Sequence, residues 1–223
     1  MLGTLYIVAT PIGNLEDITF RAVKTLKEVD LILAEDTRVT KKLLGHYDIK
    51  TNLVSYHQHS SDSKKLQILS KLIEGKNLAL VSDAGTPGIS DPGNELINYV
   101  LERSPKMQIV PVPGPSAITA ALSVSGFRTD RYIFLGFLPK KKRTKLFGWL
   151  KESKTSFAFY ESPNRLVKTL EVLSEYFGPE TRVLVARELT KLHESLYRGT
   201  IKEVQDQLPE MIKGEVVVVV EGP

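Results

Sequence analysis

Acidic side chains follow three apolar runs of the sequence, where they could accept a proton. Glu35 and Asp36 come directly after the first of these runs, Asp83 follows the second, and Glu188 follows the third. A carboxylate held beside a reacting group can act as a general base, so these four residues are our catalytic candidates. A second interpretation stays open, in which Asp36 or Asp83 only caps the turn or helix that follows.

Three loops rich in Gly and Pro also follow predicted strands, at Thr10–Asn14, Ser82–Gly93 and Pro111–Ser116. Plain connections have a median of about 4–6 residues, and the second loop is twice as long. Each loop alone is typical of an ordinary turn. Ligands of open α/β sheets bind beyond the carboxyl ends of the strands, so three such loops at one edge indicate a ligand site. Because the loops lack clustered Lys or Arg, we expect a ligand with little negative charge, bound largely by backbone groups.

Several classes of site are excluded or weakly supported. The sequence has no Gly-x-x-x-x-Gly-Lys-Ser/Thr phosphate loop, no Gly-x-Gly-x-x-Gly after its first strand, and no cysteine. His57 and His59 form a weak metal pattern, and we predict no metal. His193 could act as a base, although a lone histidine is more typical of a polar loop residue.

Strand-like runs alternate with amphipathic helical stretches, which predicts an α/β fold with a mostly parallel sheet covered by helices on both faces. The pattern is interrupted near residues 126–130 and then resumes. We therefore predict two α/β domains, residues 1–127 and 128–223. The valine run 216–220 has no polar face and predicts a central strand. The predicted strands are Leu5–Ala9, Leu31–Ala34, Leu53–Ser55, Leu78–Ser82, Met107–Val112, Tyr132–Phe137, Thr155–Tyr160, Arg182–Ala186 and Val216–Glu221, with a further one possible at the segment RGTI.

The composition is that of a soluble globular protein, and the charge is unevenly placed. The 223 residues are 42% hydrophobic and 25% charged. Residues 1–127 hold 13 Lys/Arg and 13 Asp/Glu, whereas residues 128–223 hold 17 and 13. Residues 140–154 alone contain seven basic side chains and one acidic, which indicates either a solvated helix face or a polyanion partner. No apolar stretch approaches the length of a membrane helix, so we expect a cytoplasmic protein without membrane contact.

Eight motifs then occur in a fixed order: LYIVATPIGNLEDIT, AEDTR, LVSDAGTPGISDPG, PVPGPSA, GFLPKK, FYESPNRL, ARELTKLHE and KGEVVVVVEG. In these motifs the chain resembles the bacterial 16S rRNA (cytidine) 2′-O-methyltransferase family, which has the class III tetrapyrrole methylase fold. The resemblance covers residues 5–222. It implies S-adenosylmethionine bound in a cleft between two α/β domains, a homodimer, and 16S rRNA as substrate within the small ribosomal subunit.

The resemblance also assigns residues to the methyl donor and to the RNA. Arginine and lysine are the side chains that contact RNA phosphates. For Arg165 and Arg187 structural roles stay open, the latter as an ion pair with Glu188. The donor-binding residues implied are Pro11, Ile12, Gly85, Thr86, Pro87, Ile89, Ser90, Gly114, Pro115, Tyr160, Ala186 and Glu215, and the RNA-binding residues are Arg38, Lys140, Lys141, Lys142, Arg143, Arg165 and Arg187.

Two other functions remain as alternatives. The first is methylation of a corrin or porphyrin intermediate by the same fold, and the second is a non-catalytic RNA-binding module. The basic second domain and the motifs EDTR and YESPNR favour RNA, and the intact donor loops favour an enzyme. Members of the family often continue with a helical segment after VEG, so the sequence represents a shorter member or a trimmed chain. The general base, the methylated nucleotide and the form of the RNA substrate are left open.

Overall fold

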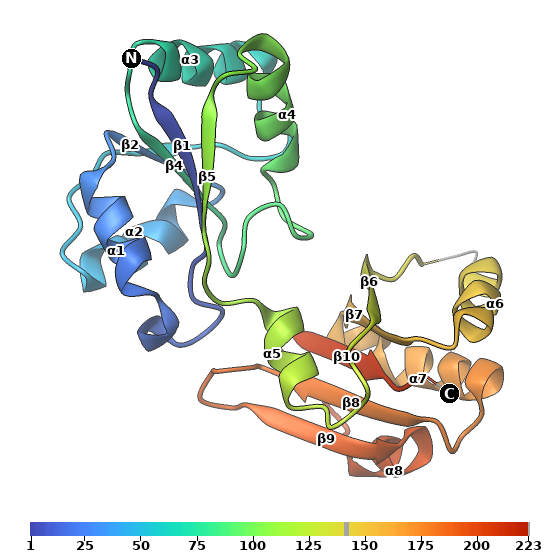
Figure 1. The fold of residues 1–223 in the computed structure, drawn as a ribbon. Coiled ribbons are helices and arrows are strands. Elements are labelled where there is room, and N and C mark those ends of the chain that lie inside the picture. The colour runs from blue at the N-terminus through green and yellow to red at the C-terminus, as the bar shows by residue number, and fades with distance from the viewer. Residues whose placement is uncertain (141–142, 223) are drawn as a thin grey trace. The chain divides into compact units, whose positions relative to one another are not determined.

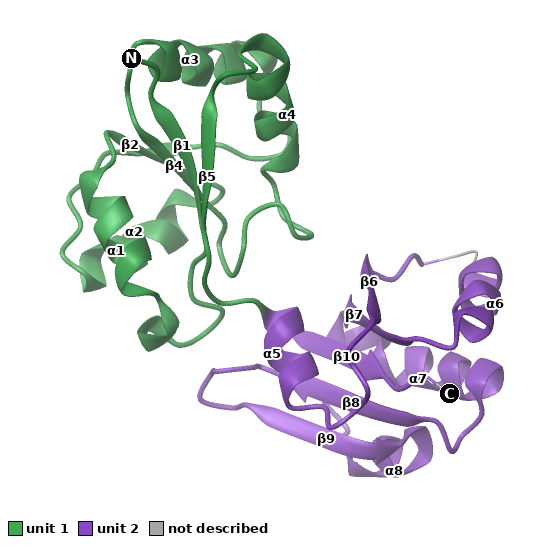
Figure 2. Cartoon of the chain, in the orientation of Figure 1, with its two compact units in different colours: residues 1–116 green, residues 117–223 purple. Residues whose placement is uncertain are grey.

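A computed structural model describes residues 1–140 and 143–222 of the chain, which divides into two compact units, Met1–Ser116 and Ala117–Pro223 (Figure 2). Among the described residues, no helix has both the length and the apolar character needed to cross a membrane. The elements of the first unit are β1 (Thr4–Val8), η1 (Leu15–Asp17), α1 (Phe20–Glu28), β2 (Leu31–Ala34), α2 (Thr37–His46), β3 (Leu53–Ser55), α3 (Asp62–Ile73), β4 (Leu78–Val81), α4 (Asn94–Arg103) and β5 (Gln108–Val112).

The first unit is a parallel sheet with the strand order β3-β2-β4-β1-β5 (Figure 1). Successive side chains of a strand point to opposite faces of a sheet, and β4 uses both faces. Leu78 and Leu80 pack with the buried side chains of α3 and α4 on one face. Ala79 and Val81 pack with those of α1 and α2 on the other. The prediction of a parallel sheet with helices on both faces is confirmed for this unit.

The second unit is a five-stranded sheet with the order β6-β7-β10-β8-β9. Its elements are α5 (Ala117–Ser123), β6 (Tyr132–Phe137), α6 (Arg143–Ser153), β7 (Ser156–Glu161), α7 (Pro163–Phe177), β8 (Arg182–Arg187), β9 (Ser195–Thr200), α8 (Ile201–Gln207) and β10 (Val216–Val220).

The sheet of the second unit is mixed, which differs from the mostly parallel sheet that the alternating pattern predicts. Strands β6 and β7 are parallel, whereas β10 is antiparallel to β7 and β8, and β8 is antiparallel to β9. The link from β8 to β9 is too short for the crossover of a dozen or more residues that parallel neighbours need. The predicted central strand is confirmed, since β10 lies in the middle of the sheet with all five valines buried. The segment RGTI, for which a further strand is considered, forms the end of β9 and the first residue of α8.

The division between the units falls after Ser116, before the predicted boundary at residue 127. Helix α5 lies in the second unit because it packs against β7 and β10. The link that follows α5 is tied to the same unit, since Arg198 Nε donates to the Val124 carbonyl at 2.9 Å and Ser156 Oγ to the Arg128 carbonyl at 2.7 Å. The interruption near residues 126–130 is therefore a connection inside the second unit.

Candidate functional site

The three Gly/Pro-rich loops of the first unit are bonded to one another at the carboxyl edge of its sheet. Thr10 and Gly85 exchange two backbone hydrogen bonds, of 2.9 and 3.0 Å, as an isolated bridge between the first two loops. Thr86 Oγ1 donates to the Pro115 carbonyl at 3.2 Å, which joins the second loop to the third. Thr10 Oγ1 also donates to the Ser82 carbonyl at 3.1 Å. The loops thus form one connected structure, which we call the three-loop junction: residues 9–14, 82–93 and 113–116.

Two glycines of the junction stand where a side chain would crowd its neighbours. Gly88 has φ +84°, and a Cβ there would lie 2.6 Å from Asn94 Oδ1. The Asn94 amide donates to the Gly88 carbonyl at 2.9 Å and fixes the loop in this form. A Cβ on Gly114 would lie 3.0 Å from the Cβ of Ala9, where the first and third loops approach each other. Gly88 and Gly114 therefore allow the loops of the junction to pack closely.

The predicted donor-binding residues of the first unit cluster at this junction. Ile12 is buried, and its Cγ2 lies 3.4 Å from the position of a Cβ on Gly85. Gly85 and Pro87 are also buried, whereas Ile89 and Ser90 are exposed farther along the loop, where Ser90 has φ +59°. Pro11, Thr86 and Pro115 are partly buried, and Gly114 is exposed.

In the second unit, two of the predicted donor-binding residues share one row of the sheet. Tyr160 of β7 and Ala186 of β8 both pair with Val217 of the strand between them. The Tyr160 ring packs against Phe134 and Phe137, with centroid distances of 5.1 and 5.5 Å. Glu215 precedes that central strand and is exposed.

The catalytic candidates of the first unit form an acidic group in which Asp83, within the junction, contacts the segment of Glu35 and Asp36 beside it. The Asp36 carboxylate caps α2 by accepting the Arg38 N–H at 2.8 Å, and it also accepts from the Arg38 guanidinium. These bonds lower the pKa of Asp36 to about 2. Asp83 Oδ1 accepts the Asp36 N–H at 3.0 Å, so Asp83 ties the second loop to the start of α2. Asp36 therefore caps a helix, as the second interpretation of the sequence has it, and its carboxylate stays ionised.

Glu35 differs from its neighbours in its electrostatic environment. Burial raises the pKa of Glu35, the charges of Asp83 and Asp36 raise it further, and His57 acts in the opposite direction. A raised pKa makes a carboxylate a better proton acceptor near neutral pH. Among the four candidates, Glu35 therefore has the environment best suited to a general base.

Glu188, the fourth candidate, joins two loops of the second unit. Its Oε1 accepts the Glu215 N–H and the Lys191 ammonium, each at 2.8 Å. Burial raises the pKa of Glu188, but these hydrogen bonds outweigh it, and the net shift is downward. Gly214 lies against this carboxyl group, where a Cβ would overlap Glu188 Cδ. Glu188 thus has a structural function here and is a weaker candidate for the base.

Arg143 and Arg165, predicted to bind RNA, are used inside the second unit. Both flank the Glu161 carboxylate, which is fully buried: Arg165 Nε lies 3.0 Å from Oε1 and Arg143 Nη2 lies 3.8 Å from Oε2. Arg165 also donates to the Leu138 carbonyl and Arg143 to the Pro139 carbonyl, each at 2.7 Å. The two arginines hold the segment that leads into α6. Sequence reasoning missed this role of Glu161, although Glu161 and Arg165 have the i, i+4 spacing of an ion pair.

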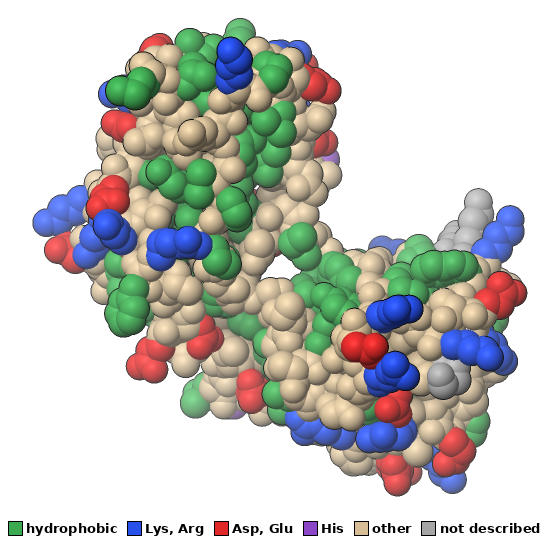
Figure 3. Space-filling model, in the orientation of Figure 1, with side chains coloured by type: hydrophobic (Ala, Val, Ile, Leu, Met, Phe, Trp, Pro, Cys, Tyr) green, Lys and Arg blue, Asp and Glu red, His purple; other side chains and the backbone are tan. Residues whose placement is uncertain are grey.

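The other predicted RNA-binding residues lie in different settings. Arg187 donates to the carbonyls of Lys213 at 2.6 Å and His193 at 3.1 Å, so it supports the same loops as Glu188. Arg38 is highly exposed, as is Lys140. Lys141 and Lys142 lie outside the described residues. On the face shown in Figure 3, Lys and Arg side chains are interspersed with Asp and Glu.

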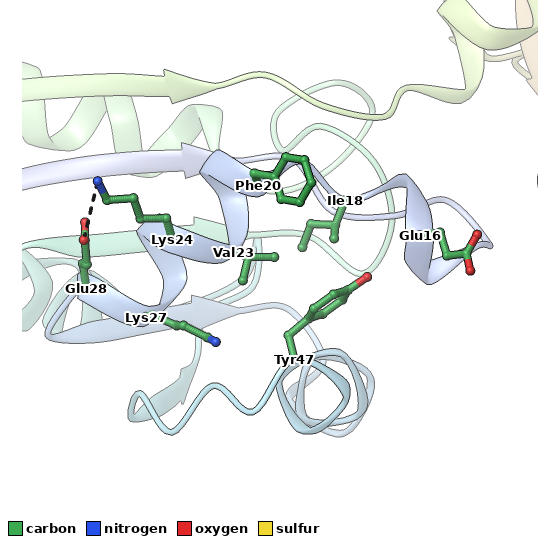
Figure 4. A pocket seen from close by; sticks show the side chains of 8 residues that line it. All are labelled: Glu16, Ile18, Phe20, Val23, Lys24, Lys27, Glu28 and Tyr47. Carbon is green, nitrogen blue, oxygen red and sulfur yellow. Dashed lines mark ion pairs between the residues drawn. The ribbon is translucent and has the colours of Figure 1, made fainter.

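A separate pocket lies beside α1, with a volume of about 680 Å³ (Figure 4). Apolar side chains line its middle, and the ion pair of Lys24 with Glu28 lies at one end. None of the predicted site residues lines it, so the pocket and the three-loop junction are distinct places. Its lining residues are Glu16, Ile18, Phe20, Val23, Lys24, Lys27, Glu28 and Tyr47.

Comparison with known proteins gives the class of the chain. The family model of tetrapyrrole (corrin/porphyrin) methylases matches residues 4–205. The crystal structure of the methyltransferase CobJ covers 99% of this chain and 94% of its own, with a TM-score of 0.72 and 22% identity. A crystal structure of uroporphyrin-III C-methyl transferase from Thermus thermophilus complexed with S-adenyl homocysteine covers 97% of each chain, with a TM-score of 0.68 and 18% identity. These structures show that the fold is that of a tetrapyrrole methylase.

Curated relatives define the group more narrowly. Ribosomal RNA small subunit methyltransferase I of Halalkalibacterium halodurans is 50% identical over 223 residues, covering 99% of this chain and 76% of the relative. The protein of the same name from Thermotoga maritima is 48% identical and is covered over 99% of both chains. This chain belongs to the ribosomal RNA small subunit methyltransferase I family, within the tetrapyrrole methylases.

The buried Glu161 predicts a large effect on stability. Glu161→Gln removes the charge that balances Arg143 and Arg165, and breaking such a buried pair costs about 3 kcal/mol. We expect urea unfolding to show a loss of this size in the free energy of unfolding. Glu171→Gln, at an exposed position of α7, serves as the matched control and should change it by less than about 0.5 kcal/mol. Equal stabilities of the two variants would contradict the role given to Glu161.

Proposed function

We propose that this chain transfers the methyl group of S-adenosylmethionine to the 2′-hydroxyl of a cytidine in 16S rRNA, within the small ribosomal subunit. Similarity over 99% of the chain to proteins named ribosomal RNA small subunit methyltransferase I carries the proposal. The cytidine and its 2′-hydroxyl are implied by the family resemblance of the eight ordered motifs. We further propose that the enzyme acts in the cytoplasm as a homodimer and without a metal.

The three-loop junction has the chemical character that such a donor requires. S-Adenosylmethionine has a positively charged sulfonium, and the junction contains no Lys or Arg but includes Asp83 and Asp91. Glycines bring the backbone close to any bound ligand, and the hydrogen bonds between the loops hold them in place. We assign donor binding to this junction and to Tyr160, Ala186 and Glu215 of the second unit. The uroporphyrin-III enzyme of the same fold, solved with S-adenyl homocysteine, supports the assignment of this class of ligand.

The donor, when bound, supplies an electrophilic methyl group whose carbon–sulfur bond breaks with its electron pair going to sulfur. The tasks left for the protein are to hold the ribose oxygen in line with that bond and to take the hydroxyl proton. We assign the proton to the Glu35 carboxylate, which lies beside the junction. Asp83 connects the donor loop to the segment that contains Glu35, because it accepts the Asp36 N–H.

RNA contacts are assigned to the exposed basic side chains. Arg38 is exposed while it pairs with Asp36, so its outer face is available to a phosphate. Lys140 is exposed in the segment that Arg143 and Arg165 hold in place. These two arginines therefore act on RNA binding through the position of that segment.

Transfer of labelled methyl from S-adenosylmethionine tests the proposal. Small ribosomal subunits that lack the modification and naked 16S rRNA would be offered side by side, followed by nuclease digestion and mass analysis. We expect one labelled 2′-O-methylcytidine, and the preferred substrate identifies the form of RNA that is recognised. Label on a corrin or porphyrin substrate and none on RNA would contradict the proposal, as would no label on any substrate with the donor bound.

The role of Glu35 predicts a shift in pH dependence. A base works in its deprotonated form, so its raised pKa places the acid limb of the rate profile above the range of an ordinary glutamate. Asp83→Asn keeps an acceptor for the Asp36 N–H but removes a charge that raises the pKa of Glu35, so the limb should move to lower pH. Glu35→Gln should lower kcat by about 10²-fold or more.

Glu74→Gln, an exposed position after α3, is the control and should leave kcat and its pH profile unchanged. A Glu35→Gln enzyme within twofold of the unaltered rate would show that another group takes the proton.

A further inference from the structure

Helix α6 presents an exposed aromatic side chain on the face that the protein core does not use. Phe147 and Leu150 are buried and pack in the core of the second unit. Trp149, the only tryptophan of the sequence, is 52% exposed. Lys145 lies one helical turn before it at spacing i, i+4, so the two side chains share the outer face. Tryptophan is highly buried on average in folded proteins, and here half of the side chain offers an apolar surface to a partner.

Nothing in the part of the chain that the structure describes requires a glycine at position 148, next to this tryptophan. A glycine within a helix costs about 1 kcal/mol relative to alanine. Apart from its two chain neighbours and the backbone of its own helix, a Cβ at Gly148 would meet no described atom within 4 Å, so no other element excludes a side chain there. Gly148 is exposed, so the helix has bare backbone at the position that precedes Trp149.

The outer face is held firmly and its surroundings are basic. Lys151 Nζ donates to the Tyr176 carbonyl at 3.1 Å, and the Tyr176 hydroxyl donates to Thr144 Oγ1 at 3.1 Å, so both ends of α6 are tied to α7. The Phe147 and Tyr176 rings pack at 5.3 Å between these ties. Among the described residues of 140–154, exposed lysines outnumber the one acidic side chain, Glu152, which is complementary to a polyanion; they are Lys140, Lys145, Lys151 and Lys154.

We propose that Trp149 stacks on an unpaired base of the RNA substrate, with Gly148 leaving room for the base and Lys145 contacting a neighbouring phosphate. Proteins bind single-stranded RNA through aromatic rings on which bases stack and through cations that contact phosphates. The inference rests on the proposed function, because it names the contact by which the same enzyme holds its RNA. Charge favours RNA over a second copy of this chain as the occupant.

The single tryptophan allows a direct test by fluorescence, because all indole emission of the chain comes from Trp149. The full chain would be titrated with a 16S rRNA transcript, and the affinity for S-adenosylmethionine would be measured in parallel. We expect saturable quenching of the emission. Trp149→Ala should weaken RNA binding by about 5- to 100-fold, the effect of one stacked base, and leave donor affinity unchanged.

Two further variants separate stacking from a general loss of structure. Trp149→Phe keeps a ring and should recover most of the RNA affinity. Phe20→Ala removes an even more exposed aromatic side chain, 98% exposed, from the first unit and should have no effect on RNA binding.

Three results would overturn either the stacking contact or the proposed function on which it rests. Unchanged emission at saturating RNA, while methyl transfer to rRNA proceeds, would overturn the stacking contact and leave the proposed function standing. Emission that changes with protein concentration alone, together with loss of self-association in Trp149→Ala, would assign this face to a second copy of the chain. Failure of the unaltered enzyme to methylate rRNA would instead overturn the proposed function.

Discussion

The pair of backbone hydrogen bonds between Thr10 and Gly85 is the interaction on which the candidate site depends. It joins the loop after β1 to the loop after β4, and the bond from Thr86 to Pro115 adds the loop after β5. Neighbouring parallel strands place these loops at one edge, and the hydrogen bonds convert that proximity into a fixed arrangement. Asp83, on the middle loop, extends the connection to Asp36 and to the segment that contains Glu35. One set of contacts thus supports both the proposed donor site and the proposed base.

In the second unit a buried carboxylate has the corresponding organising role. Glu161, at the end of β7, accepts from Thr169 of α7 at 2.8 Å and lies between Arg143 and Arg165. The two arginines also donate hydrogen bonds to backbone carbonyls of the segment before α6, so they fix that segment as well. Arg143 and Arg165, which the resemblance assigns to RNA binding, therefore support the exposed side chains that are proposed to contact RNA.

The sequence predicted the features that arise from periodicity and composition. The central valine strand, the parallel sheet of the first unit and the three loops all follow from local patterns. It did not predict the antiparallel pairing of β8 with β9 and β10, because strand direction depends on which strands become neighbours. Likewise, the engagement of Arg143 and Glu188 depends on contacts with Glu161 and Glu215, which are distant in the sequence and which no local spacing encodes. The exposure of Trp149 became visible only once the buried face of α6 was known.

Hydrogen exchange of the full chain, with and without S-adenosylmethionine, tests the central claim most directly. Amide exchange reports which backbone segments a ligand protects. The account predicts slower exchange on donor binding in residues 9–14, 82–93 and 113–116, with the pocket beside α1 unchanged. Protection confined to the residues of that pocket, from Glu16 to Glu28 and at Tyr47, would contradict it and would place the donor away from the three-loop junction.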